Sequence, residues 1–403
     1  MTSPAIVGAP APAILVPADT KRLFPELFRS GSPDVWVYRY EDPATGWRLS
    51  IATCAAPGSG KLSLGGFRIA PAERTSSPGF DSDREAVGLA IGMDEKVYWS
   101  RLMKIGGPLA RRDSARIVGG KCVLHPTANA RVGQPNDRAL LDFAAACLHD
   151  AEARGGFHVT TGQDLGHGVM SDGSMGSLDY LNSRFAGSVV ADTSKPTGEG
   201  NYHVLAGMLR GVGIPLGRAT VGLVGCGNIG MHMLARLRES GATILALESS
   251  DVRRAEVAAL GIRTFAPSEK DAFLAQPMDA VVVNASGNSL DPHAVARIAK
   301  NDRITVVCGS ENLVMPDHDA GSEALRAARK AYAPTELGGM MGYLTAVEQY
   351  LAHIEQVPFD VKTLFAAARG LEPLAFAASA LAREQAYAIS FEDAMREVCG
   401  APG

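Results

Sequence analysis

Hydrophobic residues from position 220 onward follow two alternating patterns. Continuous apolar runs at 220–225 (TVGLVG) and 243–249 (TILALES) are typical of strands that are buried on both faces. Between them, residues 229–240 repeat apolar side chains at helical spacing. Apolar strands alternating with amphipathic helices predict a parallel sheet that is covered by helices on both sides, a Rossmann-type doubly wound α/β domain.

The first 190 residues carry shorter strand patterns mixed with helical ones. Two β-like runs, VWVYRY and RLSIATC, are separated by turn residues in the manner of a meander. Strand and helix patterns then alternate, with helices at about 83–104 and at 137–155 and strands at 117–124 and 157–161. This order predicts a second α/β domain.

With 403 residues, the chain is too long for one ordinary core, and two domains are expected. The polar segment 191–201 (ADTSKPTGEGN) is interpreted as a linker. We therefore expect a substrate and oligomerisation domain at 1–195 and a nucleotide domain at 196–345. The Ala- and Leu-rich residues 346–403 are expected to form helices that pack back on the first domain. Prolines interrupt residues 1–19, and this segment is expected to be a loose arm. It lacks the features of a signal peptide.

Charge and cysteine usage narrow the class of protein. The net charge is −4 and no basic block is present, so neither a nucleic-acid partner nor a membrane partner is expected. No stretch reaches the roughly 18–20 apolar residues of a membrane helix. The six cysteines are spaced singly, which predicts reduced thiols in a cytoplasmic protein. His125, His167 and His203 lack ligand spacing, so no metal is expected.

The turn after the strand at 220–224 carries the pattern G-x-G-x-x-G. It reads Gly225-Cys226-Gly227-Asn228-Ile229-Gly230 and opens the next predicted helix. Glycines in this context allow a tight turn, close approach of a pyrophosphate and close packing of helix on strand. The alternative is a similar loop that binds no phosphate.

Glu248 ends the following predicted strand. An acidic residue at that position accepts hydrogen bonds from the adenosine ribose and repels a 2′-phosphate, which favours NAD. The nearby Arg253 and Arg254 leave NADP as the alternative, because arginines can pair with that phosphate.

Lys121 stands behind two glycines and ahead of an apolar run, in RIVGGKCVLHP (116–126). Most Gly-Gly-Lys triplets form surface turns. A lysine at the start of a buried strand is the other interpretation, and its charge would then need a function or a partner.

Several motifs together resemble the glutamate/leucine/phenylalanine/valine dehydrogenase superfamily, most closely its leucine and phenylalanine branch. They occur in the family's order: LSIATC…LSLGGFR (49–68), GGKCV (119–123), TTGQDLGHG (160–168), VGCGNIG, VNASG, CGSENL and YAPTELGG. The resemblance implies a soluble, usually oligomeric enzyme of two α/β domains that deaminates an amino acid reversibly to its 2-oxo acid and ammonia, with NAD as oxidant. It also implies that Lys121 is the catalytic acid and base and that Asp164 is its proton-relay partner. Ala285, Ser286 and Asn312 match cofactor-side positions.

The family's lysine for the substrate carboxylate has two counterparts. Lys104 stands where a predicted helix ends, and we favour it. Lys96, in Met93-Asp-Glu-Lys96, matches the local pattern but is interpreted as a solvated surface lysine. Either choice implies an insertion near 110–116 (ARRDSAR). A second departure from the family puts Gly200 where a threonine contacts the nicotinamide amide, and YAPTELGG is shorter than its counterpart.

Residues at the family's specificity positions indicate the substrate class. Leu64 replaces the lysine that precedes the paired glycines, Gly65 and Gly66, in the glutamate-specific branch. A leucine cannot compensate the desolvation of a side-chain carboxylate, so an apolar or aromatic amino acid is expected. Met340 and Tyr343 extend this apolar wall, unless they are core residues of a helix. The rival functions are a different reaction on an imine or oxo acid and a catalytically silent homologue that binds NAD and amino acid.

Overall fold

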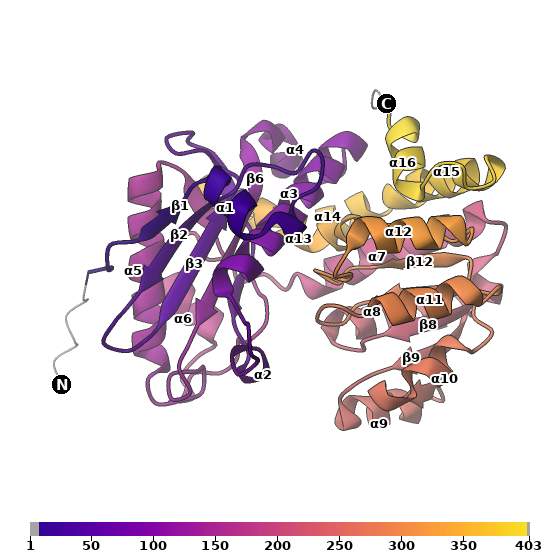
Figure 1. Ribbon diagram of the computed structural model, residues 1–403, viewed down its shortest axis with the longest axis horizontal. Helices are drawn as coiled ribbons and strands as arrows, with labels where there is room; N and C mark the ends of the chain where they lie inside the picture. Colours follow the sequence, from indigo (N-terminus) through magenta and orange to yellow (C-terminus); the bar gives the residue numbers. More distant parts are fainter. Residues whose placement is uncertain (1–7, 401–403) are drawn as a thin grey trace. The chain divides into compact units, whose positions relative to one another are not determined.

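The computed structural model describes residues 8–400, and its chain divides into two compact units (Figure 1). Unit 1 comprises the chain up to Val97, together with Arg112–Asp192 and Ala346–Phe359. Unit 2 comprises Tyr98–Arg111, Thr193–Thr345 and the chain from Asp360 onward. Each unit has its own sheet, as the two predicted α/β domains require.

A mixed seven-stranded sheet forms the centre of unit 1, in the order β1-β2-β3-β6-β4-β7, with β5 paired to β6. The strands β1, β2, β3 and β6 pair antiparallel with one another, whereas β4 and β5 pair parallel with β6, and β7 pairs parallel with β4. The strands are β1 (Ala13–Leu15), β2 (Trp36–Glu41), β3 (Arg48–Thr53), β4 (Leu62–Leu64), β5 (Phe67–Ile69), β6 (Ile117–His125) and β7 (His158–Thr160).

Strand β6 lies inside unit 1 because both of its faces are covered. Val118, Cys122 and Leu124 belong to the same hydrophobic cluster as the apolar face of α5 (Asp137–Gly155). Residues on the other face alternate with them, and Gly119 lies directly against Ala90 and Asp94 of α3 (Ser82–Met103). The side chains of β6 that point away from α5 are therefore buried as well.

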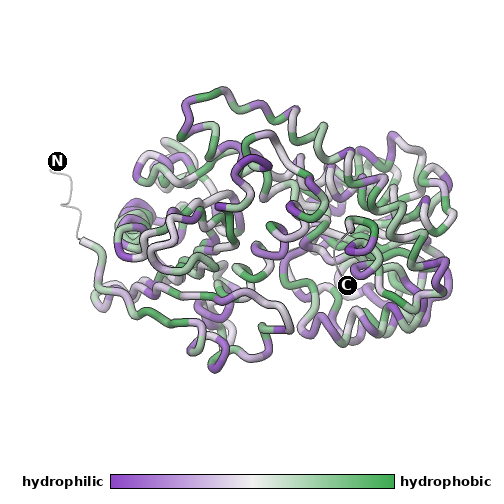
Figure 2. Tube along the Cα trace, turned by 90° about the horizontal axis from the view of Figure 1, so that it is seen from above, coloured by the Kyte–Doolittle hydropathy of each residue, from purple (hydrophilic) through white to green (hydrophobic). Residues whose placement is uncertain are grey.

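Unit 2 contains a fully parallel six-stranded sheet in the order β10-β9-β8-β11-β12-β13. Its strands are β8 (Thr220–Val224), β9 (Thr243–Leu247), β10 (Arg263–Phe265), β11 (Ala280–Val283), β12 (Val306–Gly309) and β13 (Ala331–Tyr332). The connecting helices include α8 (Asn228–Glu239), α9 (Asp251–Ala259), α11 (Pro292–Lys300) and α12 (His318–Ala327). Each of these helices combines buried apolar with exposed polar residues, as expected of helices that cover a sheet with one face. Hydrophobic and hydrophilic residues are mixed along the helical turns of the chain (Figure 2).

Two expectations about the ends of the chain are wrong. Residues 13–15 of the expected loose arm form β1, which pairs antiparallel with β2, and helix α1 (Pro17–Leu23) follows; residues 1–7 lie outside the described part. Of the C-terminal segment, only Ala346–Phe359 belongs to unit 1, whereas the described residues from Asp360 onward belong to unit 2. The apolar face of these helices is buried on unit 2 itself.

The expected linker at 191–201 is also wrong, because most of it begins a buried helix, α7 (Ser194–Gly211). Small residues allow this: Gly207 and Gly211 lie against the backbone of α15 (Leu371–Glu384), where a side chain would collide. By length and composition alone, Lys362–Glu384 is apolar enough to cross a membrane. That segment consists of two helices, α14 (Lys362–Ala368) and α15, and both contact α7.

Candidate active site

Lys121 lies in the middle of β6, opposite Ala52 of β3, and is 3% exposed. It is a buried cation and not a surface-turn lysine. A Cβ on the preceding Gly120 would lie 2.1 Å from the Ser63 hydroxyl, and one on Gly119 would lie 2.3 Å from the Asp94 amide nitrogen. The two glycines therefore allow α3 and β4 to pack closely on β6.

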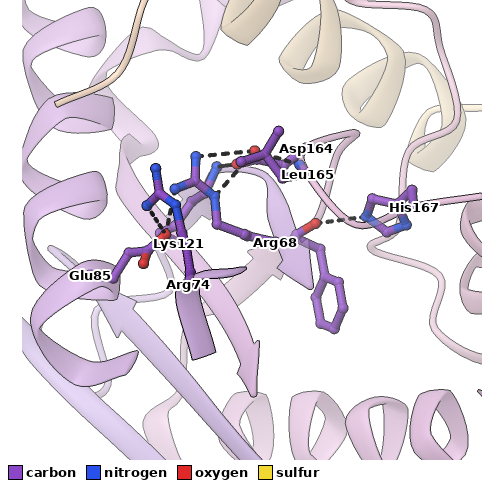
Figure 3. Close-up of polar contacts among 8 residues, drawn as sticks. Arg68, Arg74, Glu85, Lys121, Asp164, Leu165 and His167 are labelled. Atoms are coloured by element: carbon purple, nitrogen blue, oxygen red, sulfur yellow. Dashed lines mark hydrogen bonds and ion pairs between the residues drawn. The ribbon is translucent and has the colours of Figure 1, made fainter. Parts of the chain in front are cut away.

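Asp164 lies in the loop after β7 and forms an ion pair with the Lys121 ammonium (Figure 3). The Leu165 backbone N–H donates a hydrogen bond of 2.6 Å to Asp164 Oδ1, which fixes the carboxylate. Gly66 lies against the ammonium, since a Cβ there would be 2.7 Å from Lys121 Nζ. The structure thus brings together three residues that the sequence assigned to the site.

Arg68 extends the pair into a buried network that sequence reasoning left without a role. Its guanidinium donates from Nε and Nη2 to Asp164 Oδ1, at 3.3 and 3.2 Å, and from Nη1 to Glu85 (Figure 3). Glu85 also accepts a hydrogen bond of 2.9 Å from Arg74. Arg68 is the last residue of the motif LSLGGFR. Its burial among charged groups, which indicates a function, is visible only in the structure.

Burial is the largest influence on Lys121 and lowers the pKa of its ammonium; Arg68 lowers it further, while Asp164 opposes both. Burial alone would raise the pKa of Asp164, but the positive charges of Arg68 and Lys121 outweigh it and hold that pKa well below its ordinary value. The carboxylate therefore stays ionised while the lysine loses its proton more readily than a solvated amine. Such a pair is suited to proton transfer.

The two candidate carboxylate anchors differ in their environments. Lys96 lies within α3 and is 4% exposed, so its interpretation as a solvated surface lysine is wrong. Two residues before it, Asp94 accepts a hydrogen bond of 2.8 Å from the Gly119 backbone N–H, which holds this turn of α3 against β6. Lys104 follows the last residue of α3, is exposed and has a left-handed φ of 55°. The segment 110–116, where an insertion is expected, contains the end of α4 (Pro108–Arg112) and a 3-10 turn, Ser114–Arg116.

Leu64 ends β4, between Gly119 of β6 and Thr160 of β7, and is 1% exposed. Because paired residues of parallel strands point to the same side of a sheet, Leu64 lies on the face of β6 that carries Lys121. Gly65 follows directly and is packed on the Gly120 carbonyl. Met340 and Tyr343 lie in α13 (Thr335–Ile354) and are 0% and 7% exposed. Their contribution to a substrate wall stays a prediction.

The histidines considered as metal ligands have other partners or lie apart. His167 bonds the Phe67 carbonyl at 2.7 Å (Figure 3). Its other ring nitrogen bonds the Ser177 hydroxyl at 2.9 Å. His203 lies between Glu199 and Glu372 on helices of unit 2. Among residues 8–400, no three His, Cys, Asp or Glu side chains form a group that could hold a metal ion.

The glycine-rich turn of unit 2 has the geometry that its pattern predicts. Gly225 has a φ of 84°, and a Cβ on Gly230 would lie 2.1 Å from the Gly225 carbonyl oxygen, so these two glycines serve the turn and the packing of α8. Gly227 is different: in the described part of the chain, no atom outside its own neighbours lies within 4 Å of the place where its Cβ would be. The exposed Gly227 and Asn228 begin α8 with no side-chain cap. Free N–H groups at such a helix N-terminus bind phosphate.

Glu248 follows β9 and stabilises the glycine-rich turn. Its carboxylate accepts hydrogen bonds from the Cys226 N–H at 2.5 Å and from the Ser250 N–H at 2.8 Å. Burial would raise the pKa of Glu248, but these backbone donors outweigh it, so the pKa is lowered and the carboxylate stays charged. Arg253 pairs with Glu256, and Arg254 donates to the backbone carbonyls of 248 and 249. Both nearby arginines therefore already have partners.

Polar residues beyond β11 and β12 form a second wall of unit 2 that sequence reasoning covered only in part. The exposed Ala285 and Ser286 follow Asn284, whose side-chain oxygen accepts from Asn201 Nδ2 at 2.8 Å and from the Ser310 hydroxyl at 2.6 Å. The buried Asn201 Oδ1 has no hydrogen-bond partner among residues 8–400. Glu311 accepts from the Ala285 N–H at 3.1 Å and from the Ser289 N–H, and the half-buried Asn312 follows it. Gly200, at the family's threonine position, is packed on Met341.

Solved structures of amino acid dehydrogenases match almost the whole chain. The L-tryptophan dehydrogenase from Nostoc punctiforme superposes with a TM-score of 0.60 at 18% identity, covering 90% of this chain and 93% of that one. The chain has the fold of the amino acid dehydrogenases. The hetero-hexameric glutamate dehydrogenase from Thermus thermophilus gives a TM-score of 0.63 at 13% identity and covers 98% of this chain and 88% of its own. Glutamate dehydrogenase from Plasmodium falciparum gives 0.61 at 13% identity, covering 95% and 84%.

No protein-family model matches the chain, and no curated protein sequence matches it. The superpositions on solved amino acid dehydrogenases confirm the fold that the motif resemblance implied, with two domains of which one is of the Rossmann type.

Proposed function

We propose that the protein is an NAD-dependent dehydrogenase that deaminates an apolar or aromatic L-amino acid reversibly to its 2-oxo acid and ammonium. The observation that carries the proposal is the buried Lys121–Asp164 ion pair. A structural lysine needs no second cation beside it, whereas Arg68 adjoins this one and favours loss of its proton.

Unit 2 fits a dinucleotide at its glycine-rich turn. The open space beside Gly227 and the uncapped start of α8 accommodate a pyrophosphate, and Glu248 supplies a negative charge where the adenosine ribose would lie. The engagement of Arg253 and Arg254 with other groups supports NAD over NADP. When bound, the nicotinamide supplies the hydride acceptor for oxidation of the substrate Cα.

Residues of unit 1 then handle substrate and protons. Lys121 Nζ, in its neutral form, takes a proton from the water that attacks the substrate iminium carbon, and returns a proton to the departing amine. Asp164 holds Lys121 in place and stabilises its charged form. Lys96 supplies the cation for the substrate carboxylate; its burial favours it over Lys104. Leu64 excludes an acidic side chain, since it offers no partner to a second carboxylate.

The test is reductive amination of a panel of 2-oxo acids with ammonium and NADH, followed by the loss of absorbance. Turnover of apolar or aromatic oxo acids, with little turnover of 2-oxoglutarate, is expected. No turnover with any member of the panel, with either NADH or NADPH, would refute the proposal. Comparing Lys96→Ala with Lys104→Ala identifies the carboxylate anchor, since only loss of the anchor raises the KM for every oxo acid.

A further inference from the structure

Arg68 is buried between two carboxylates and connects the catalytic pair to α3. Its side chain is 4% exposed, and it contacts Asp164 through two nitrogens and Glu85 through a third. A guanidinium fork that is held at both ends has a fixed orientation. Asp164 is therefore held from three directions, by Arg68, by the Leu165 N–H and by Lys121.

The charges of this network balance almost entirely inside the protein. Lys121 and Arg68 are cations, Asp164 and Glu85 are anions, and the exposed fractions of all four side chains are 10% or less. Arg74 adds a cation on the Glu85 side, but its side chain is 30% exposed and is therefore partly screened by solvent. Removing one buried charge must change the proton affinity of the titrating member, because water does not screen the others.

We propose that Arg68 is a positioning residue that holds Asp164 in place and sets the proton affinity of Lys121, and that Glu85 limits this effect by neutralising part of the Arg68 charge. Asp164 shares its charge between two cations. Without Arg68, the whole carboxylate would serve Lys121, and the lysine would hold its proton more tightly. Without Glu85, Arg68 would act more strongly on Asp164, and the lysine would release its proton more readily.

This inference extends the proposed function, in which Lys121 exchanges protons, but it concerns a property that is measurable without any substrate. Carbamylation of Lys121 by cyanate, a small reagent that reacts with neutral amines, is followed by peptide mass spectrometry at a series of pH values. The midpoint of the rate against pH reports the proton affinity of Lys121. The wild-type protein is compared with Arg68→Gln, Arg68→Lys, Glu85→Gln and, as a matched control, Arg131→Gln.

The control removes a cation from the same unit whose hydrogen bonds go to the Ala70 carbonyl and the Thr75 hydroxyl, neither of which is charged. We expect Arg68→Gln to move the Lys121 midpoint upward by about one pH unit, a tenfold gain in proton affinity. Glu85→Gln should move it downward by a smaller amount, and Arg68→Lys and Arg131→Gln should leave it near the wild-type value.

Equal midpoints in Arg68→Gln, Glu85→Gln and Arg131→Gln would overturn the inference. If Arg68→Gln does not fold, the downward shift in Glu85→Gln decides alone. The oxo-acid panel is a separate assay: a protein that turns over no substrate but shows the two opposite shifts would refute the proposed function and leave this inference standing. The pH–rate profile of active variants should move in the same directions as the carbamylation midpoints.

Discussion

The Lys121 ammonium faces the Asp164 carboxylate in an ion pair whose side chains are only 2% and 10% exposed. Removing one partner of a buried pair leaves the other charge without compensation, which costs about 3–5 kcal/mol in folding free energy. Without Asp164 the uncompensated charge would be that of Lys121, because Arg68 keeps its ion pair with Glu85. A change in this pair is therefore expected to affect stability as well as the proposed activity.

Asp164→Asn should lower kcat by about 10²–10⁴-fold, because the lysine loses the group that orients it and stabilises its charge. It should also lower the midpoint of thermal unfolding, measured by circular dichroism. Asp172→Asn is the matched control, since Asp172 pairs with Arg138 where both side chains are more than 40% exposed. Such a surface pair contributes about 0–1 kcal/mol, so the control should resemble the wild type. Equal kcat values for the two variants would argue against a role for Asp164 in proton transfer.

Gly227→Ala should fold as the wild type does and bind NADH at least about tenfold more weakly, a loss of about 1.4 kcal/mol. The added methyl group meets no protein atom within 4 Å, so it occupies only the space proposed for the pyrophosphate. Binding is measured by NADH fluorescence titration. Gly230→Ala provides the contrast, because its methyl group would lie 2.1 Å from the Gly225 carbonyl oxygen and should lower the thermal midpoint. Unchanged NADH affinity in folded Gly227→Ala would place the cofactor elsewhere.

If the proposed function holds, Leu64→Lys should shift the substrate preference toward oxo acids with an acidic side chain. The new ammonium lacks a counter-charge unless the substrate supplies one, so the ratio of kcat/KM for 2-oxoglutarate to that for an apolar oxo acid should rise at least about tenfold. Because ligand binding stabilises the folded state, 2-oxoglutarate should also raise the thermal midpoint of the variant but not of the wild type.

Leu62→Lys controls for the burial of a lysine on the same strand. Leu62 and Leu64 are both 1% exposed and, being two residues apart, point to the same side of β4. The control should lose stability with no gain in 2-oxoglutarate activity. A similar change of substrate preference in both variants would mean that Leu64 does not contact the substrate side chain.

Protonation of Glu199 at acid pH is expected to lower the stability of unit 2. Burial would raise the pKa of its carboxyl group, but hydrogen bonds from His203 and His232 and the charge of Arg236 outweigh it and lower that pKa. The folded form therefore binds fewer protons than the unfolded one. The stabilising contribution of the Glu199 carboxylate is fully present above the unfolded pKa of about 4.3 and is lost as the pH falls below that value.

Urea unfolding between pH 7 and pH 3 checks this dependence. The unfolding free energy of the wild type should fall more steeply below about pH 4.5 than that of Glu199→Gln, which has no carboxyl group to titrate at this position. Parallel curves for the two proteins would show that Glu199 contributes nothing to the acid sensitivity.

Local sequence features were sufficient to predict several of the secondary-structure elements. The strand–turn–helix around Gly225 and Gly230 and the helix over 137–155 depend on periodicity and on glycine positions, which act within a few residues. The resemblance of successive motifs likewise implied Lys121 and Asp164, and the structure brings these two together.

Tertiary structure decided what depends on residues that are distant in sequence. The segment around 194–201 is polar but forms part of a buried helix, because its glycines pack on other helices, Gly198 on His232 of α8 and Gly200 on Met341 of α13. Lys96 has a surface-like sequence context, yet it is buried in α3. The buried charge network forms only where β5, α3 and the loop after β7 meet and bring together Arg68, Glu85 and Asp164. The energy of a charge depends on its burial and on its neighbours, and the order of residues specifies neither.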